Sequence, residues 1–400
     1  MSPTAIASNT SNIVHDATAA IESLKLKNTS KPEIPEWVEP PVTKEDLQWA
    51  DLETIDLNLL DSKDPAVRAQ LTAAAKKALT VDGFLFVTGT GVSNETLKRN
   101  LAIAQYATEG IPLGQKIPFA AKLDEGSYEG YKLRGIWTKD GGVPDNIEHY
   151  NLESTSFEDP DLKHPAKLLP LLPEIQAFAH HTYYHVVYRI LKLVSLALEL
   201  DEDYLWGLHD QNGVLGAACQ RYMSYLPRNE EEEKATEGIW SKGHTDYNSI
   251  SLLYSQPISA LQILTPQNEW RWVKHVEGAV VVNTADALEF LTGGVFKATR
   301  HRVIRPPPDQ VNIIRYILIH FARVRRDLPL EPIWDSPLVK REGKNVFQDR
   351  IDAGGKAPTQ DEWLRERIRR TGRELYDNKQ KQQNGKVEEE VLGRKVEYYV

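Results

Sequence analysis

Beyond Cys219 the chain divides into short apolar segments separated by turn residues, and this pattern limits the fold more than any other feature. The segments include QRYMSYL, SISLLYS, GAVVVNTADALEFLT, KATRHRVIR and IIRYILIHF. In LTPQNEWRWV, polar residues interrupt the apolar ones, which predicts a hairpin around Gln267 to Glu269. Short strands repeated at this spacing are typical of an antiparallel sandwich or a jelly roll.

The part of the chain before Cys219 mixes helix and strand patterns. DPAVRAQLTAAAKKALTV predicts a helix, GFLFVT predicts a buried strand, and the next helix should begin at Ser93 or Asn94. An apolar run from about Pro173 to Leu200 predicts a longer helix. The sequence therefore predicts a mainly β protein with flanking helices and an N-terminal α/β module.

Two histidines on that longer helix have a spacing that can bind a metal ion. His181 and His185 are four residues apart, so they share one helix face. No acidic residue stands between them as in zinc proteases, and their neighbours are aromatic and apolar. We therefore interpret both as packed side chains.

The composition indicates a globular protein whose partners are small molecules. The chain has 400 residues, 41% of them apolar, which is enough to bury a sizeable core. Its 48 basic and 57 acidic residues give a net charge of -9, which argues against binding to nucleic acids or to anionic membranes. The oligomeric state is left open.

A single cysteine, Cys219, limits the compartment and the kinds of metal site. No intrachain disulfide can form, and cysteine-rich zinc or iron–sulfur sites are excluded. The N-terminus has no basic segment followed by an apolar core, and no apolar run approaches the roughly 18 residues of a membrane span. We therefore expect a cytoplasmic protein without a membrane anchor.

The stretch SKGHTDYNSISLLY places a histidine and a carboxylate at the start of a strand pattern. Side chains two apart on a strand share a face, so His244 and Asp246 can point into one cavity while Thr245 points away. A turn rich in hydrogen-bonding residues would also explain this pair. As a third ligand, KATRHRVIR offers His301, and the interval leaves room for several crossings of a sandwich.

Two histidines and one carboxylate on one side of a metal ion leave its other positions open. This is the facial triad of non-haem Fe(II) oxygenases. Zinc accepts the same ligands, in which case the protein would be a hydrolase with an activated water. The triad by itself leaves the metal undecided.

Several segments resemble one known family in their order and spacing. They are DGFLFVTGTGVSNETL, RYMSYLP, GHTDYNSISLL, LQIL, EWRWVKHVEGAVVVNTADALEFLTGG and ATRHRV, within about residues 50–325. The chain resembles the Fe(II)/2-oxoglutarate-dependent dioxygenases, in the branch with isopenicillin N synthase and the plant flavonoid and gibberellin oxygenases. The resemblance implies that His244, Asp246 and His301 hold Fe(II) at one end of a double-stranded β-helix.

With this resemblance the chain divides into four expected parts. They are an extended N-terminal arm (1–45), an α/β module (46–210), a double-stranded β-helix core (211–330) and a C-terminal helical extension (331–400).

The resemblance also implies 2-oxoglutarate and O2 as co-substrates, with ascorbate as a reductant in vitro. The family usually has Arg-x-Ser on the strand after the second histidine, where the arginine binds the far carboxylate of 2-oxoglutarate. Arg315 in VNIIRYILIHF is the candidate here, and Ile317 stands in place of the serine. Because RPPPDQ lengthens the preceding turn, Arg305 is a rival anchor.

A second departure affects the tyrosine that often helps to bind 2-oxoglutarate at the end of the family's NYYP segment. Leu226 occupies that place in SYLP, and the adjacent Ser224 and Tyr225 are candidates to replace it. These departures leave open an enzyme like isopenicillin N synthase, which needs no 2-oxoglutarate. A metal-dependent hydrolase and a non-catalytic binding protein are further alternatives, and the intact triad counts against the second.

Four residues are candidates for the wall of a substrate pocket. They are Tyr247 beside the metal ligands, Phe321 at the end of the Arg315 strand, and Arg134 with Trp137 in the glycine-rich stretch GYKLRGIWTKDGG. Together they predict a partly aromatic pocket, with Arg134 as a partner for a substrate carboxylate. We expect a small carboxylated or polycyclic metabolite that is hydroxylated, desaturated or cyclised in secondary metabolism.

Overall fold

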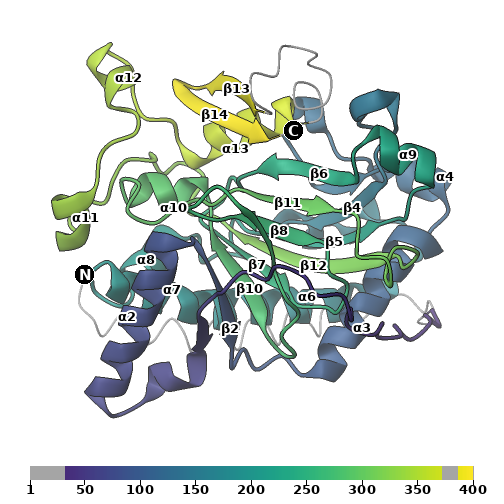
Figure 1. Cartoon of the computed structure of the whole chain (residues 1–400), viewed down its shortest axis with the longest axis horizontal. Helices are drawn as coiled ribbons and strands as arrows, with labels where there is room; N and C mark the ends of the chain where they lie inside the picture. Colours follow the sequence, from purple (N-terminus) through teal and green to yellow (C-terminus); the bar gives the residue numbers. More distant parts are fainter. Residues whose placement is uncertain (1–31, 372–385, 400) are drawn as a thin grey trace.

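The computed structural model describes residues 32–371 and 386–399, and every structural statement below concerns these residues (Figure 1). Two β-sheets face each other, and helices cover the outer face of the larger one. This arrangement confirms the predicted jelly roll with flanking helices. Most of the N-terminal arm, residues 1–31, lies outside the described residues.

The larger sheet, called the major sheet, has eight strands and is antiparallel except for its first pair. It contains strands of the predicted α/β module (46–210) and strands of the predicted core (211–330), so these two parts share one sheet. In spatial order the strands are β1 (Thr54–Asp56), β2 (Phe84–Thr88), β10 (Val280–Thr284), β7 (Ile250–Tyr254), β12 (Arg315–Ala322), β5 (Cys219–Tyr225), β4 (Ile147–Leu152) and β3 (Gly130–Lys132).

The smaller sheet, called the minor sheet, has six strands. Its pair β8 and β9 forms the hairpin predicted around Gln267 to Glu269. In spatial order the strands are β13 (Lys386–Val391), β14 (Arg394–Tyr399), β6 (Ile239–His244), β11 (His301–Ile304), β8 (Leu261–Leu264) and β9 (Trp270–Trp272).

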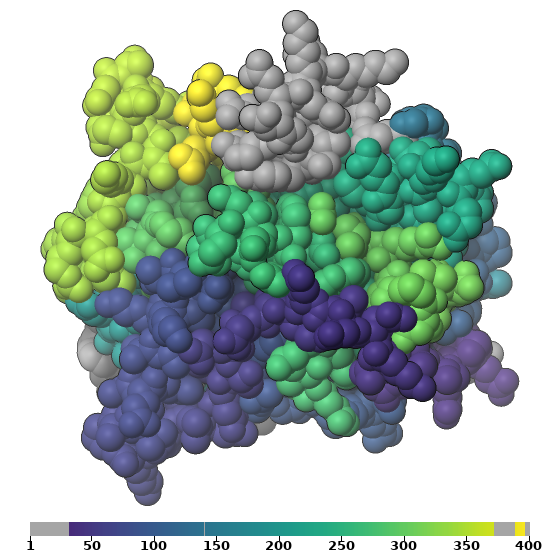
Figure 2. Space-filling view, viewed as in Figure 1, coloured from purple at the N-terminus to yellow at the C-terminus, as the bar shows by residue number. Residues whose placement is uncertain are grey.

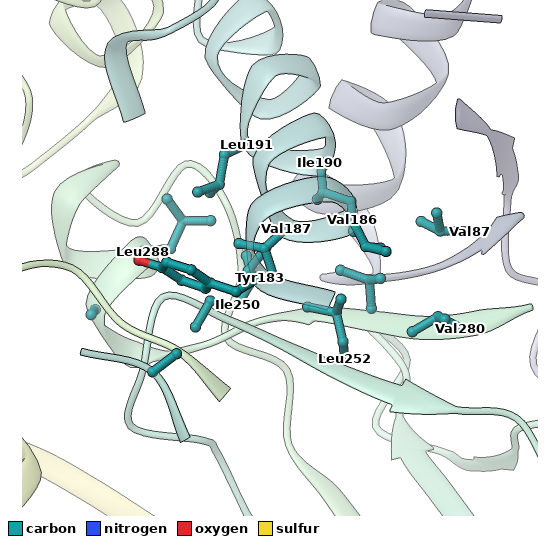
Figure 3. Close-up of a cluster of buried hydrophobic side chains, with 14 of the residues drawn as sticks. Val87, Tyr183, Val186, Val187, Ile190, Leu191, Ile250, Leu252, Val280 and Leu288 are labelled. Carbon is teal, nitrogen blue, oxygen red and sulfur yellow. The ribbon is translucent and has the colours of Figure 1, made fainter. Parts of the chain in front are cut away.

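Alternation along the strands divides the core into two layers. On β2, Phe84 and Phe86 pack between the sheets, while Leu85 and Val87 face the helices. Figure 3 shows the helix-side layer, in which Val186 and other side chains of one helix lie over β2, β7 and β10. Packing on both faces explains why β2 (FLFVT) and the first half of β10 (VVV) are continuously apolar in sequence.

The helices that cover the major sheet match the predicted ones. The first is α2 (Pro65–Val81), and α3 (Asn94–Gln105) is capped by Ser93, whose side chain accepts from the Thr96 amide. The long apolar helix consists of α6 (Leu172–His181), a π-helical segment (Thr182–Val187) and α7 (Tyr188–Ala197). None of the helices in the described ranges is long and apolar enough to cross a membrane.

The remaining helices are short. They are α4 (Leu113–Lys116), α5 (Pro160–Lys163), α8 (Tyr204–Leu208), α9 (Glu230–Ala235), α10 (Asp286–Leu291), α11 (Pro337–Glu342), α12 (Gln348–Asp352) and α13 (Gln360–Arg370). A π-helical turn lies at Tyr106–Gly110, and 3-10 turns lie at Leu57–Asp61, Ile117–Phe119, Leu123–Glu125, Asp140–Gly142, Ser154–Phe157 and Leu169–Leu171.

The described part of the N-terminal arm runs over the surface without a helix or a strand pair of its own until Trp49 (Figure 2, dark purple). The residues just after the arm are joined to the minor sheet by two backbone hydrogen bonds. The Ala50 amide donates to the Trp272 carbonyl at 2.7 Å, and the Trp272 amide donates to the Gln48 carbonyl at 2.9 Å. This short segment therefore extends the edge of the minor sheet beside β9.

The predicted helical extension at the C-terminus is wrong for its last residues. After α13 the described chain resumes as the hairpin β13–β14, with Leu392 and Gly393 at positive φ in its two-residue turn. In KVEEEVLGRKVEYY only Val396 and Tyr398 keep the period of two that marks a strand, so the sequence signal for this hairpin is weak. Tyr399 pairs with Gly243, so the hairpin joins the minor sheet directly beside His244.

Candidate active site

The structure brings the three predicted metal ligands together at one end of the two sheets. His244 ends β6 and His301 begins β11, and these two residues are direct partners in the strand pairing. Asp246 follows β6, with its Oδ1 3.9 Å from His244 Nε2 and 3.7 Å from His301 Nε2. One ligand atom from each residue lies within 4.8 Å of the others. The arrangement is the one that the spacing predicted.

Neighbouring groups orient His244 and Asp246. Nδ1 of His244 donates to the Lys242 carbonyl at 2.8 Å, which leaves the Nε2 lone pair facing Asp246. Asp246 Oδ2 accepts from Ser251 Oγ at 2.6 Å and from Asn283 Nδ2 at 3.1 Å, so its Oδ1 remains available to a metal ion that the imidazoles could also bind. Ser251 and Asn283 were not predicted, because they become neighbours of Asp246 only through the sheet pairing.

The electrostatics of the cluster suit a divalent metal ion. Burial, together with the neighbouring His301, holds the pKa of His244 below its usual value, so this imidazole is neutral. Burial alone would raise the pKa of Asp246, but the two histidines and its two hydrogen bonds lower it overall. A neutral imidazole and an ionised carboxylate are the states that bind metal, and two histidines with one carboxylate fit Fe(II).

The three ligands line a cavity between the sheets. Its empty space, with the open mouth included, is about 1180 Å³. Besides these three residues, the wall includes aromatic, apolar and positively charged side chains, and Asp246 is the only acidic residue that the described part of the chain contributes to it. Of the four residues predicted for the substrate pocket, three line this cavity: Trp137, Tyr247 and Phe321.

Arg315 lies in the cavity wall and forms no ion pair with an acidic side chain of residues 32–371 or 386–399. It begins β12, is 3% exposed, and its Nε and Nη1 have no hydrogen-bond partner. Burial lowers its pKa to about 10, so it remains charged at neutral pH. Its guanidinium lies 5.6 Å from the ring of Tyr225, its partner on β5. A buried guanidinium without an acidic partner is costly, so an anionic ligand at this position would stabilise it.

The geometry distinguishes Arg315 from its rival, Arg305. Arg305 forms an ion pair with Glu230 near the surface and is not part of the cavity wall. Ile317 lies two residues after Arg315 and faces the same cavity, so the family's serine hydroxyl is missing there.

Two predicted site residues lie outside the cavity. Ser224 points to the opposite face of β5, because its neighbour Tyr225 faces inward and strand side chains alternate. Arg134 is exposed in a turn after β3 and does not contribute to the cavity wall. We therefore withdraw Ser224 as a co-substrate ligand and Arg134 as the partner of a substrate carboxylate.

The C-terminal helix α13 holds the segment that carries Asp246. Asp286 accepts from Trp363 Nε1 at 3.0 Å and Arg367 Nη1 at 2.9 Å, while its own amide donates to the Asp246 carbonyl at 2.9 Å. The Arg367 guanidinium also lies 4.3 Å from the Tyr247 ring centroid. The amphipathic pattern predicted this helix, but it contained no signal for its contact with the site.

His181 and His185 form no metal site in the described chain. Their rings stack at a centroid distance of 4.8 Å, and His181 Nε2 donates to the Thr90 carbonyl at 2.9 Å. Across residues 32–371 and 386–399, the cluster of His244, Asp246 and His301 is the one group of such side chains close enough to share an ion. The interpretation as packed side chains fits the partly buried His181, but it is wrong for His185, whose side chain is exposed.

Comparison with known protein families gives two matches along the chain. The model of the 2OG-Fe(II) oxygenase superfamily matches residues 217–324, and that of the N-terminal region of non-haem dioxygenases in morphine synthesis matches residues 52–174. The first match contains His244, Asp246, His301 and Arg315.

Curated relatives share about a quarter of the aligned residues. A 2-oxoglutarate-Fe(II) type oxidoreductase of Emericella nidulans is 28% identical, in an alignment covering 62% of this chain and 74% of the relative. A leucoanthocyanidin dioxygenase of Malus domestica is 26% identical, covering 62% of this chain and 68% of the relative.

Solved structures show the same fold at lower identity. A full-length Neurospora crassa protein in complex with alpha-KG aligns with a TM-score of 0.66 at 18% identity, covering 83% of this chain and 99% of that one. JOX2 in complex with 2OG, Fe and JA aligns with a TM-score of 0.57 at 21% identity, covering 86% of this chain and 96% of that one.

Proposed function

This chain belongs to the Fe(II)/2-oxoglutarate-dependent dioxygenase family, and from that premise we propose that His244, Asp246 and His301 hold its iron. The enzyme is an oxidoreductase that uses Fe(II), 2-oxoglutarate and O2. We assign the far carboxylate of 2-oxoglutarate to Arg315, with Tyr225 beside it.

One observation carries this assignment: the triad and a buried arginine without a counter-ion line the same cavity. A structural arginine at 3% exposure would be expected to have an acidic partner within the chain. Arg315 has none among the described residues, so its charge is available to a dicarboxylate. This favours a 2-oxoglutarate enzyme over the variant that needs no 2-oxoglutarate.

The chain's own residues bind, orient and exclude water. Ser251 and Asn283 fix Asp246, and the Lys242 carbonyl fixes the ring of His244, so the metal-binding atoms are held before any ion arrives. The apolar wall around them limits access of water, which strengthens each charge interaction inside the cavity. When bound, iron, 2-oxoglutarate and O2 would together supply the oxidant that attacks a C–H bond, with release of succinate and CO2.

The substrate is a small molecule, because the triad lies inside the cavity rather than on an open surface. Trp137, Tyr247 and Phe321 supply aromatic walls on which a compact organic molecule can pack.

The test is iron binding and 2-oxoglutarate turnover by full-length protein. Wild-type protein should retain iron and release succinate from 2-oxoglutarate, whereas alanine at His244, Asp246 or His301 should remove both. His181→Ala is the matched control, since it removes a histidine outside the cavity and should leave both unchanged. Full iron content and turnover in all three triad variants would contradict the assignment.

A further inference from the structure

A second arginine without a counter-ion, Arg221, lines the same cavity. Its Nε donates to Asn151 Oδ1 at 2.6 Å, and its guanidinium lies 4.9 Å from the ring centroid of Tyr128 and 4.8 Å from that of Phe321. These contacts hold the planar group in place but do not neutralise it. No acidic side chain in the described part of the chain forms an ion pair with Arg221.

Arg221 lies too far from Arg315 to serve the same carboxylate. Arg315 is paired with Tyr225 on β5, and Arg221 lies four residues before Tyr225 on that strand. At about 3.3 Å per residue, this places the two arginine backbones about 13 Å apart along the sheet. Both face the cavity, because residues two and four apart on a strand share a face.

The charges around the cavity balance only when a further anion is included. In the proposed site the doubly negative co-substrate and Asp246 offset the iron and Arg315. The other buried arginine of the wall, Arg323, is already paired with Glu153 at 2.8 Å. One positive charge, that of Arg221, is therefore left over and fits a singly charged anion.

The surroundings of Arg221 favour a carboxylate attached to an apolar body. Met223, Ile319 and Phe321 lie beside it on the inner face of the sheet. His149, directly opposite Met223 on β4, is 3% exposed, and neither of its ring nitrogens has a partner. Burial, with Arg221 and Lys132 nearby, holds the pKa of His149 well below its usual range, so it offers a neutral donor and acceptor. A dianion such as a phosphate monoester would need more than one free cation.

We infer that the substrate is a small carboxylic acid with an apolar or aromatic body, and that Arg221 binds its carboxylate. The inference rests on the proposed function, because it assigns Arg315 and the triad to the co-substrate and the iron. It replaces the exposed Arg134 with a residue of the cavity wall.

The experiment measures binding by calorimetry in full-length protein loaded with Mn(II) and 2-oxoglutarate, which prevents turnover. The probes are 4-phenylbutanoate, 2-naphthylacetate and 4-cyclohexylbutanoate, each compared with its methyl ester. Wild-type protein should bind at least one acid, with its ester roughly 10- to 100-fold weaker, as expected for the loss of charge-assisted hydrogen bonds. Arg221→Leu should weaken binding of the acid by the same factor and leave binding of the ester unchanged.

Arg302 supplies a matched control. Its Nε donates to Gln262 Oε1 at 2.8 Å and its guanidinium lies 4.3 Å from the Trp270 ring centroid, so it repeats the contacts of Arg221. It does not line the cavity, and Arg302→Leu should bind the acid like wild type. Arg221→Lys, which keeps the charge, should retain part of the preference for acid over ester.

The outcomes separate this inference from the proposed function. Failure of wild-type protein to bind 2-oxoglutarate would contradict the proposed function. The titration with the acids is therefore also carried out without 2-oxoglutarate, so that binding at Arg221 is measured independently of the co-substrate. Equal binding of acid and ester by wild type, unchanged acid binding in Arg221→Leu, or no binding of any acid would each overturn the inference. Loss of 2-oxoglutarate binding in Arg221→Leu would overturn it too, by assigning Arg221 to the co-substrate.

Discussion

Arg315 and Arg323 lie at the two ends of strand β12, and they differ in what neutralises their charge. Both line the cavity, and they are 3% and 4% exposed. Arg323 donates to Glu153 at 2.8 Å, and although burial opposes it, this pairing raises its pKa. Arg315 has no acidic partner in the described chain, and burial lowers its pKa.

This difference separates a charge that stabilises the fold from a charge that awaits a ligand. A paired buried arginine leaves an uncompensated carboxylate behind when it is removed, whereas an unpaired one leaves nothing. The two arginines should therefore respond oppositely to the same substitution. The predictions below test that contrast, beginning with the largest effect.

The largest expected effect is on the free energy of unfolding. Arg323→Met should lower it by about 3 kcal/mol, at the low end for a broken buried pair because Arg326 still contacts Glu153 at 2.7 Å. Arg315→Met should leave it unchanged or raise it, in protein without 2-oxoglutarate. Urea unfolding of the two variants beside wild type measures both values. Equal destabilisation by the two substitutions would contradict the proposed difference between a paired arginine that stabilises the fold and an unpaired one that binds a ligand.

The same pair predicts a pH dependence. Burial alone would raise the pKa of Glu153, but Arg323 and Arg326 lower it overall. A carboxyl with a lowered pKa contributes stability above its unfolded pKa, about 4.3, and loses that contribution as the pH falls through the folded value. The difference in the free energy of unfolding between wild type and Arg323→Met should therefore become smaller below about pH 4.

The next effect concerns 2-oxoglutarate. Arg315→Leu should raise its apparent KM by roughly 10- to 100-fold, because a charge-assisted pair contributes about 1.5–3 kcal/mol. Arg305→Leu is the control, since that residue pairs with Glu230 outside the cavity. If the KM increased in Arg305→Leu instead, Arg305 and not Arg315 would bind the far carboxylate of 2-oxoglutarate.

The smallest effect is expected at Tyr225. Burial raises the pKa of its phenol to about 12, so it is a neutral donor beside Arg315. Tyr225→Phe keeps the ring contact and removes one hydroxyl, which should raise the KM for 2-oxoglutarate by about 2- to 10-fold. Ser224→Ala, on the opposite face of β5, should not change the KM for 2-oxoglutarate. A larger effect of Ser224→Ala than of Tyr225→Phe would mean that Ser224, and not Tyr225, faces the cavity.

The strands and the metal triad could be predicted because their signals are local. Apolar alternation marks β5 to β12, and His244 and Asp246 are two residues apart at the end of a strand. His301 is distant in the sequence, but it starts another strand that pairs with β6. The family resemblance supplied the order of these segments.

The missed features depend on register and on contacts between distant segments. Ser224 and Tyr225 could not both face the cavity on one strand, and the same alternation would have placed Arg221 on the side of Tyr225. The acidic run at 230–233 begins α9, where Glu233 accepts from Trp240 Nε1 at 2.8 Å. Only the folded chain shows that Trp240 lies there.

The central claim is that the cavity holds iron on the triad and 2-oxoglutarate on Arg315. Anaerobic titration of the Fe(II)-loaded protein with 2-oxoglutarate tests it most directly, through the weak visible charge-transfer band of the chelated co-substrate. We expect the band in wild type, a midpoint shifted roughly 10- to 100-fold higher in Arg315→Leu, and no band in Asp246→Ala. Iron-loaded wild type without the band, or an unshifted midpoint in Arg315→Leu, would contradict the account.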